Sequence, residues 1–415
     1  MRKRRWAALG GGAAVVVASF ACATFDGAGV PPAADDGSAA EAAPPPIDAT
    51  ASVDAGSEAA SICVPAPLEP SDAGVDANCE GTGLTVGLDT SSRHCGRCGH
   101  DCLGATCVNG LCTIEQLSTE LGSTSVSAAT ATHLYYGTVG GGSRRVRRRS
   151  LATGASESLA NPTGVGYVKD VRAVGPAPAV FAILSDRGVI SVPVGGGSET
   201  TIVDDGNNTV DRLSVDETNL YWSRYGTLLA RARADGTDAA TNFAVFSATA
   251  TRVATAFVAD GTRLYYVVEE TDGDGGKTHS IWMRGPAKAD SVTQRLALVD
   301  EVVDFAFDEA FLYWSTSKGE IWRAAKTTAA PAELVARAPG PHLWSKGLAV
   351  DDAYVYAAMT LSGQGGDVQM TLVQAPKCGG PTRVVARDAI VGAGLVASGG
   401  YLFWGNNPSL QRLAK

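Results

Sequence analysis

The chain has 415 residues, a formal net charge of −9 and a hydrophobic content of 45%. This composition allows two or three globular domains and excludes a coiled coil and a polytopic membrane protein. The acidic balance also excludes a basic nucleic-acid binder, because binding to phosphates needs clustered Lys and Arg.

Residues 1–22 have the organisation of an export signal. Four basic residues precede an uncharged apolar stretch, Ala7 to Ala21, which is short for a membrane span. Cys22 directly follows a small residue, and this junction resembles the lipobox of bacterial lipoproteins. The resemblance implies a lipidated Cys22 that anchors the chain in a Gram-negative cell envelope, at the outer membrane or cell surface. An ordinary cleaved signal, giving a secreted protein, and an uncleaved anchor are the alternatives.

Residues 23–62 contain thirteen Ala, five Pro and seven acidic residues but no Lys or Arg. Such a segment buries too little apolar surface to offset its ordering entropy. We expect a disordered tether that holds the following domains away from the membrane.

Residues 63–112 hold seven of the nine cysteines and no aromatic residue. A segment that is dense in Cys but too poor in aromatic residues to build a core is expected to be a disulfide-stapled module in an exported protein. His94 and His100 raise a zinc alternative, but a zinc knuckle would need His at the position of Leu103. Apart from Cys22, the expected disulfide residues are Cys63, Cys79, Cys95, Cys98, Cys102, Cys107, Cys112 and Cys378.

The string from His94 to Cys102, followed by Cys107-Val108-Asn109-Gly110-Leu111-Cys112, resembles a Cys-rich module of Gram-negative surface lipoproteins. The resemblance implies location and disulfides but no chemistry. The spacing leaves the pairing open. Full pairing would link Cys378 to the N-terminal module, and Cys63 is the expected partner because it stands apart from the compact cluster.

Residues 113–415 contain a triplet, usually rich in aromatic residues, that occurs seven times, at 134–136, 180–182, 220–222, 264–266, 312–314, 355–357 and 402–404. The triplets recur at intervals of 40 to 48 residues. A period of this length built of short strands is typical of a β-propeller blade. We therefore expect an all-β, seven-bladed propeller, with a six-bladed ring as the alternative.

Each triplet follows a turn-forming residue by four positions: Thr130, Pro176, Asp216, Asp260, Asp308, Asp351 and Ser398. An inner strand is expected before each turn, and the triplet lies on the second strand. The seventh repeat ends after its third strand. Residues 113–118 are expected to supply the missing fourth strand and to close the ring, which removes an open sheet edge.

Segments such as Leu220-Tyr221-Trp222-Ser223, followed by Arg231-Ala232-Arg233-Ala234-Asp235-Gly236, resemble the YWTD propeller repeats of lipoprotein-receptor ectodomains. That family is six-bladed, whereas seven triplets occur here. Its shared residues are structural, so the resemblance implies no binding residue.

Candidate chemistry is sparse. The acidic loop 272–276 offers Asp272 and Asp274 as a weak calcium site, and no other cofactor is expected. The basic run 144–149 is expected to be a solvated blade edge, with an anion or partner site as the alternative. The sequence has no Gly-x-Ser-x-Gly elbow and no His-Glu-x-x-His.

These features favour a membrane-tethered extracytoplasmic binding or scaffolding propeller. It is expected to be a monomer that binds a protein or carbohydrate at one face, where second strands meet third strands and blades join. The alternative is a propeller enzyme, a lyase or hydrolase, which would gather three or more Asp, Glu or His at the channel mouth. The expected contact residues are Arg224, Tyr225, Lys318, His342, Trp344 and Lys346.

Overall fold

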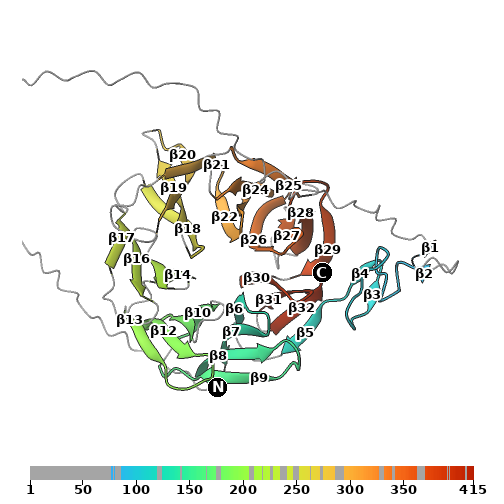
Figure 1. The fold of residues 1–415 in the computed structure, drawn as a ribbon, viewed down its shortest axis with the longest axis horizontal. Helices are drawn as coiled ribbons and strands as arrows, with labels where there is room; N and C mark the ends of the chain where they lie inside the picture. The colour runs from blue at the N-terminus through green and yellow to red at the C-terminus, as the bar shows by residue number, and fades with distance from the viewer. Residues whose placement is uncertain are drawn as a thin grey trace, which may run out of the picture. The chain divides into compact units, whose positions relative to one another are not determined.

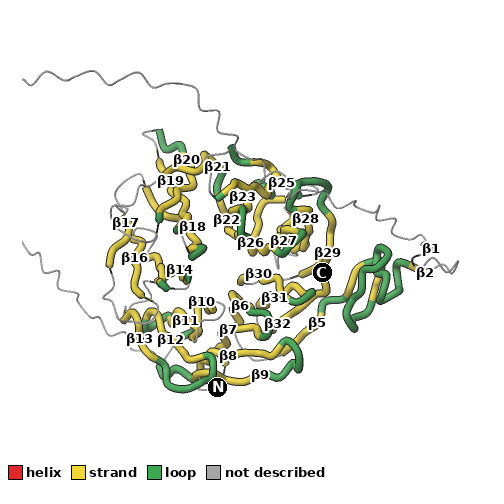
Figure 2. The backbone as a smooth tube through the Cα atoms, in the orientation of Figure 1, coloured by secondary structure: helices red, strands yellow, loops and turns green. Residues whose placement is uncertain are grey.

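The computed structural model consists of β-strands and connecting turns, and the residues that it describes contain no helix (Figures 1 and 2). The described residues are 76–77, 79, 86–118, 124–140, 143–164, 166–173, 179–204, 210–216, 218–224, 228–233, 241–245, 252–261, 263–271, 274–285, 294–326, 331–338, 342–361, 370–389, 391, 393–406 and 409–415. The expected signal, the expected lipidation site Cys22, the expected tether and Cys63 lie outside them. Within the described part, nothing is both helical and long and apolar enough to cross a membrane.

Two short hairpins build the cysteine module. The first joins β1 (Asp76–Ala77) to β2 (Val86–Gly87), and the second joins β3 (Cys107–Val108) to β4 (Leu111–Cys112). Three disulfides staple it: Cys79–Cys98, Cys95–Cys107 and Cys102–Cys112. The expectation of disulfides rather than zinc is confirmed for these six residues, and Cys378 is also disulfide-bonded.

The remaining strands form seven four-stranded antiparallel sheets, which we number in chain order of their first strands. Sheets 1 to 4 contain β6 (Thr124–Ala129), β7 (His133–Gly140), β8 (Ser143–Ser150) and β9 (Ser156–Ala160); β10 (Val168–Ala173), β11 (Ala179–Leu184), β12 (Gly188–Pro193) and β13 (Thr200–Asp204); β14 (Val210–Val215), β15 (Asn219–Arg224), β16 (Leu228–Arg233) and β17 (Thr241–Val245); β18 (Arg252–Ala259), β19 (Leu264–Thr271), β20 (Lys277–Arg284) and β21 (Gln294–Val299).

Sheets 5 to 7 contain β22 (Val302–Phe307), β23 (Phe311–Thr316), β24 (Glu320–Ala325) and β25 (Glu333–Arg337); β26 (His342–Val350), β27 (Tyr354–Leu361), β28 (Met370–Pro376) and β29 (Arg383–Ala389); β30 (Ala393–Ser398), β31 (Tyr401–Asn406), β32 (Ser409–Ala414) and β5 (Glu115–Ser118). The first strand of each sheet contacts the first strand of the next, and β30 of sheet 7 contacts β6 of sheet 1. The sheets therefore surround a common centre as in a β-propeller (Figure 1).

The triplets lie on the second strand of every sheet, as predicted. Their side chains alternate between the two faces of the strand, so that both faces pack against neighbouring sheets. Trp222, Trp314 and Trp404 are at most 1% exposed. Large aromatic side chains contribute most of the apolar area that can be buried between sheets, which explains why the repeat is visible in the sequence at these positions.

The ring is closed by strands from both ends of the propeller. β5 pairs with β32 through Leu410↔Ser118, Gln411↔Gln116 and Arg412↔Glu115. The predicted contribution of residues 113–118 to the last sheet is thus confirmed, with the strand beginning at Glu115. Pairing on both sides leaves β32 without a free edge.

Candidate functional site

A small cavity lies at the centre of the ring. It has a volume of about 90 Å³ and is lined by residues of six inner strands, among them Arg172, Arg212, Asp304 and Leu348. Each inner strand shifts register against its neighbour near this level, and Asp170, Arg212 and Asp304 directly follow such a shift. Bulges of this kind re-aim side chains, and here they present charged groups to the centre.

The channel brings acidic and basic side chains together. Asp304 accepts hydrogen bonds from the backbone N–H of Phe305 (2.9 Å) and, across the sheet boundary, from that of Leu348 (3.1 Å). Burial raises the pKa of Asp304, and the nearby Arg212 opposes that shift. Asp170 accepts a hydrogen bond from Arg172 Nε at 3.1 Å. Two carboxylates thus lie among two guanidinium groups.

The described channel residues do not form the acidic cluster that the enzyme hypothesis requires. Three or more converging Asp, Glu or His would have favoured an active site, and the channel brings together Asp170 and Asp304 with two Arg side chains. In the described part of the chain, the group of three metal-ligating residue types that lie close together is Cys95, Cys102 and Cys112, all of them in disulfides.

The residues expected to contact a ligand come from three sheets. Arg224 ends β15 and is half-buried, and Lys318 is exposed in the turn between β23 and β24, with its Nζ 2.8 Å from Asp300. His342, Trp344 and Lys346 lie in β26, opposite Leu361, Thr360 and Ala358 of β27. Tyr225 and Asp272 lie outside the described residues, and Asp274 is exposed. Arg224, Lys318 and His342 lie at the end of the ring remote from the Asp turns, whereas Lys346 lies halfway along β26. Other residues line the cavities found among the described residues.

The Asp turns form a repeated ion pair that the sequence interpretation missed. Each of three turn carboxylates is bridged by a lysine that follows the third strand of the next sheet. The Nζ–Oδ2 distances are 2.8 Å for Lys326–Asp260, 2.5 Å for Lys377–Asp308 and 2.6 Å for Lys415–Asp351. The same oxygens accept hydrogen bonds from Tyr265, Tyr313 and Tyr356. Aligning the seven repeats would have revealed the lysines, which all directly follow a third strand.

The ion pairs set the charge state of the turns. Burial alone would raise the pKa of Asp308, but hydrogen bonds from Lys377 and two backbone N–H groups outweigh it and lower the pKa below its ordinary value. Asp351 behaves in the same way with Lys415. Burial and the adjacent carboxylates raise the pKa of Tyr313 and Tyr356. The carboxyl groups of Asp308 and Asp351 are therefore charged at neutral pH. Each Asp–Lys pair thus links two neighbouring sheets, and we call the Asp, Tyr and Lys of one boundary a staple.

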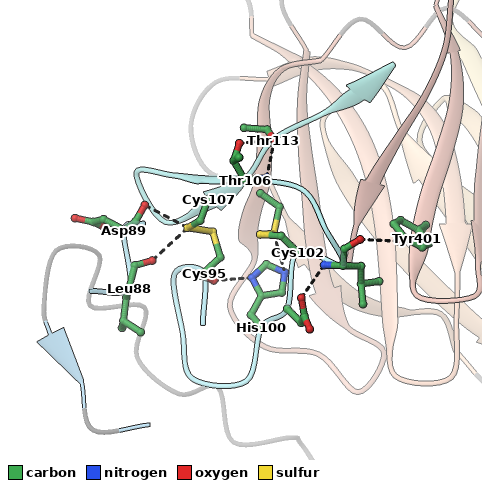
Figure 3. Close-up of a disulfide and its surroundings, with 12 residues drawn as sticks. Leu88, Asp89, Cys95, His100, Cys102, Thr106, Cys107, Thr113 and Tyr401 are labelled. Carbon is green, nitrogen blue, oxygen red and sulfur yellow. Dashed lines mark hydrogen bonds between the residues drawn. A yellow bond between two sulfur atoms is a disulfide. The ribbon is translucent and has the colours of Figure 1, made fainter. Parts of the chain in front are cut away.

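The cysteine module packs against sheets 6 and 7. Buried Cys102 and Cys112 belong to one apolar cluster with Trp404 and Leu413. The hydroxyl of Tyr401 donates to the carbonyl of Leu103 at 3.1 Å (Figure 3). The module therefore supports the sheet in which the two ends of the propeller meet.

His100 is buried inside the module. Figure 3 shows its imidazole directed at the Cys95 carbonyl, 2.6 Å from Nδ1. Burial lowers the pKa of His100, and Arg383 and Arg97 add to that effect. The ring is therefore neutral at neutral pH and serves as a hydrogen-bonded core residue.

The expectation of a solvated edge for the basic run is wrong at its first residue. Arg144 is 1% exposed and pairs with Asp186 and the carbonyls of Pro162 and Thr163. Arg148 binds Glu157. Alternation along β8 puts Arg144 and Arg148 on one face and Arg145, Arg147 and Arg149 on the other, so the run is not one basic patch.

Comparison with known proteins shows the fold alone. No family model and no curated protein matches the chain. Among solved structures, it is similar to a chain in the crystal structure of the mitotic checkpoint complex (12% identity, TM-score 0.50, covering 73% of this chain and 94% of that one). It is also similar to YCF48 bound to D1 peptide (14%, 0.50, 73% and 94%) and to U3-55K (12%, 0.50, 73% and 98%). These similarities support the β-propeller fold.

Proposed function

We propose that this protein is a binding or scaffolding propeller held at the outside of a bacterial envelope membrane. The observation that carries the proposal is the small channel lined by both acidic and basic side chains, which leaves the loops and strand ends of the ring as the surface that can contact a partner. The similarity to YCF48, solved with a bound peptide, is consistent with a protein or peptide ligand. The two-carboxylate channel does not favour the lyase or hydrolase alternative.

The partner surface that we propose is the face at which Arg224, Lys318 and His342 lie. The test is capture of envelope proteins by photo-crosslinking from the full chain. A triple Glu variant at these positions should lose the partner that the wild-type chain captures. A double variant at Glu309 and Asp352, which are exposed in turns at the opposite end of the ring, is the control. Equal capture by the triple variant would reject this face.

We also propose that the seven sheets are seven blades of one closed ring, in contrast to the six blades of the YWTD family. The succession of contacts between inner strands, which returns from β30 to β6, supports this count. An experimental structure that shows a ring of six or eight blades would reject it.

Anchoring through Cys22 completes the proposal. Several acyl chains on one residue, at about 0.8 kcal/mol per buried CH₂, are enough for stable membrane attachment. A fatty-acid analogue should label the wild-type chain and leave Cys22→Ser unlabelled. Absence of label in the wild-type chain would make the protein an ordinary secreted one.

Cys378 is proposed to pair with Cys63. Six of the other cysteines pair with one another, and Cys378 is itself disulfide-bonded. Such a bond would fasten the start of the cysteine module to sheet 6. Peptide mapping under non-reducing conditions should yield the linked pair, and any other partner would reject it.

Calcium at Asp272 and Asp274 is a separate proposal. Binding should raise the unfolding temperature of the full chain, and Asp274→Asn should reduce that increase. An unfolding temperature independent of calcium would reject the site.

A further inference from the structure

A second cavity lies between sheets 7 and 1, away from the channel. Its volume is about 250 Å³. One side is formed by the turn between β30 and β31 and by Tyr401, Phe403 and Arg412, and the other by the turn that follows β8, with Arg149 and Leu151. We call it the seam slot, because these sheets meet where the ring closes.

The seam slot lies at the position where the boundaries between sheets 4 and 5, 5 and 6, and 6 and 7 carry an Asp–Lys staple. The backbone N–H groups of Lys326, Lys377 and Lys415 donate to carbonyls of a neighbouring turn, at Ala310, Ala353 and Gly400. In sheet 1 the same bond runs from Leu151 N–H to the Thr132 carbonyl at 2.9 Å. Leu151 therefore stands at the lysine position.

The acidic partner is also replaced at the seam. Ser398 stands at the Asp position, four residues before its triplet, and its Oγ donates to the Thr130 carbonyl at 3.1 Å. At other boundaries a lysine donates to the equivalent carbonyl, as Lys326 does to Asp308 at 2.9 Å. Phe403, in place of a tyrosine, carries no hydroxyl that would need a carboxylate. Ser398, Phe403 and Leu151 thus replace all three members of the staple at this boundary.

The slot has a positive charge that comes from its two arginines. Arg149 and Arg412 line it, and its described lining contains no acidic residue. Arg412 binds Glu115 through Nε and Nη2 (2.8 and 2.6 Å), whereas Arg149 Nη1 binds neutral groups, the Leu117 carbonyl at 3.3 Å and Ser156 Oγ at 3.1 Å. The two guanidinium groups and Glu115 leave one net positive charge. The corresponding slot between sheets 4 and 5 is lined by Asp260, Asp308 and Glu309 together with Arg263 and Lys326.

The geometry points to a binding site in the seam slot for a small organic carboxylate with a short apolar tail. Guanidinium groups bind carboxylates through charge-assisted hydrogen bonds, and the single net charge matches a monoanion. Leu117, Leu151 and Tyr401 supply apolar walls for the tail. The volume lies at or just below the lower limit of ligand pockets, about 300 Å³, which restricts the ligand to a few carbon atoms. This inference is independent of the partner surface proposed above, which lies at the other end of the ring.

Isothermal titration of the full chain with butyrate at low salt tests the inference, with butyramide and inorganic phosphate as comparison ligands. Butyrate should bind saturably, and butyramide should bind about tenfold more weakly or not at all, because it lacks the charge. Saturable binding of phosphate without binding of butyrate would overturn the assignment to carboxylates. Failure of butyrate to bind at all would overturn the site.

Two variants locate the binding. The double change Leu151→Lys with Ser398→Asp installs the staple of the other boundaries in the slot, and it should reduce butyrate affinity about tenfold or more while thermal unfolding shows an intact fold. Arg145→Gln, exposed on the same strand, removes an equal charge outside the slot and should leave the affinity within about twofold. Undiminished binding by the folded double variant would overturn the inference.

Discussion

The boundaries between successive sheets from 4 to 7 differ from the seam between sheets 7 and 1, although the same backbone hydrogen bond to a turn occurs at each of them. At three boundaries a turn Asp, a Tyr hydroxyl and a Lys ammonium from the next sheet form a neutral staple. At the seam Ser398, Phe403 and Leu151 replace all three, and two guanidinium groups face a cavity instead. The comparison teaches that one repeated position carries a neutral ion pair at three boundaries and, at the seam, a cavity whose charged lining is purely basic.

The largest expected effect on stability comes from the disulfide of the cysteine module that packs on sheet 7, next to the seam. The double change Cys102→Ser with Cys112→Ser removes a buried disulfide of the module that packs on sheet 7. It should lower the free energy of unfolding by about 3 kcal/mol, measured by chemical denaturation.

Hydrogen exchange should also increase in the strands of sheet 7 in that variant. The control is Cys79→Ser with Cys98→Ser, because Cys98 is exposed and this pair lies outside the shared apolar cluster. Equal exchange in sheet 7 for both double variants would show that the module does not support the seam.

Loss of one staple should lower the free energy of unfolding less than loss of the disulfide, but by a measurable amount. Asp308→Ala leaves the ammonium of Lys377 half-buried without its carboxylate, and both side chains are 18% exposed in the pair. The free energy of unfolding should fall by about 2 kcal/mol. Lys318→Gln, which breaks the exposed pair with Asp300, is the control and should leave the unfolding midpoint unchanged. If Asp308→Ala left the free energy of unfolding unchanged, the ion pairs would not stabilise these boundaries and the comparison with the seam would fail.

The staples predict a specific response to acid. Their hydrogen bonds hold the pKa of Asp308 and Asp351 in the folded chain below the ordinary value of 3.8. The stabilisation is therefore fully present above that value and is lost as the pH falls through the lower folded pKa. Thermal unfolding from pH 6 to pH 2 should show a steeper decline for the wild-type chain than for Asp308→Asn with Asp351→Asn. Parallel curves would contradict the assignment.

The smallest effect is expected from converting the seam into a staple. Leu151→Lys with Ser398→Asp should raise the free energy of unfolding by about 0.5 kcal/mol, since a partly exposed ion pair contributes little. Differential scanning calorimetry of the two proteins measures it. A marked loss of stability would mean that the seam backbone differs from that of the other boundaries.

The repeats and the closing strand could be predicted from the sequence because each depends on local pattern. Aromatic triplets such as Leu312-Tyr313-Trp314 recur with a regular period, and residues 113–118 directly precede the first repeat, which suits a strand that completes the last sheet. The expected contact residues were chosen by loop position alone, and the structure places them on three sheets without a shared pocket among the described residues. Arg144 shows what local pattern cannot predict. A run of arginines suggests a solvated strand edge, but Arg144 is buried in an ion pair with Asp186, which lies 42 positions away in the sequence.

By itself, the sequence determined the cysteine-rich module, the all-β repeats and the turn residues, because strand alternation, turn chemistry and apolar burial act over a few neighbouring positions. Only the tertiary structure decided which cysteines pair and which lysine reaches which aspartate, since these partners come from separate segments. Lys377 and Asp308 are 69 positions apart in the chain but 2.5 Å apart in space. The seam slot also depends on tertiary structure. Its two arginines come from β8 and β32, which are far apart in the sequence and meet only because the last sheet packs against the first.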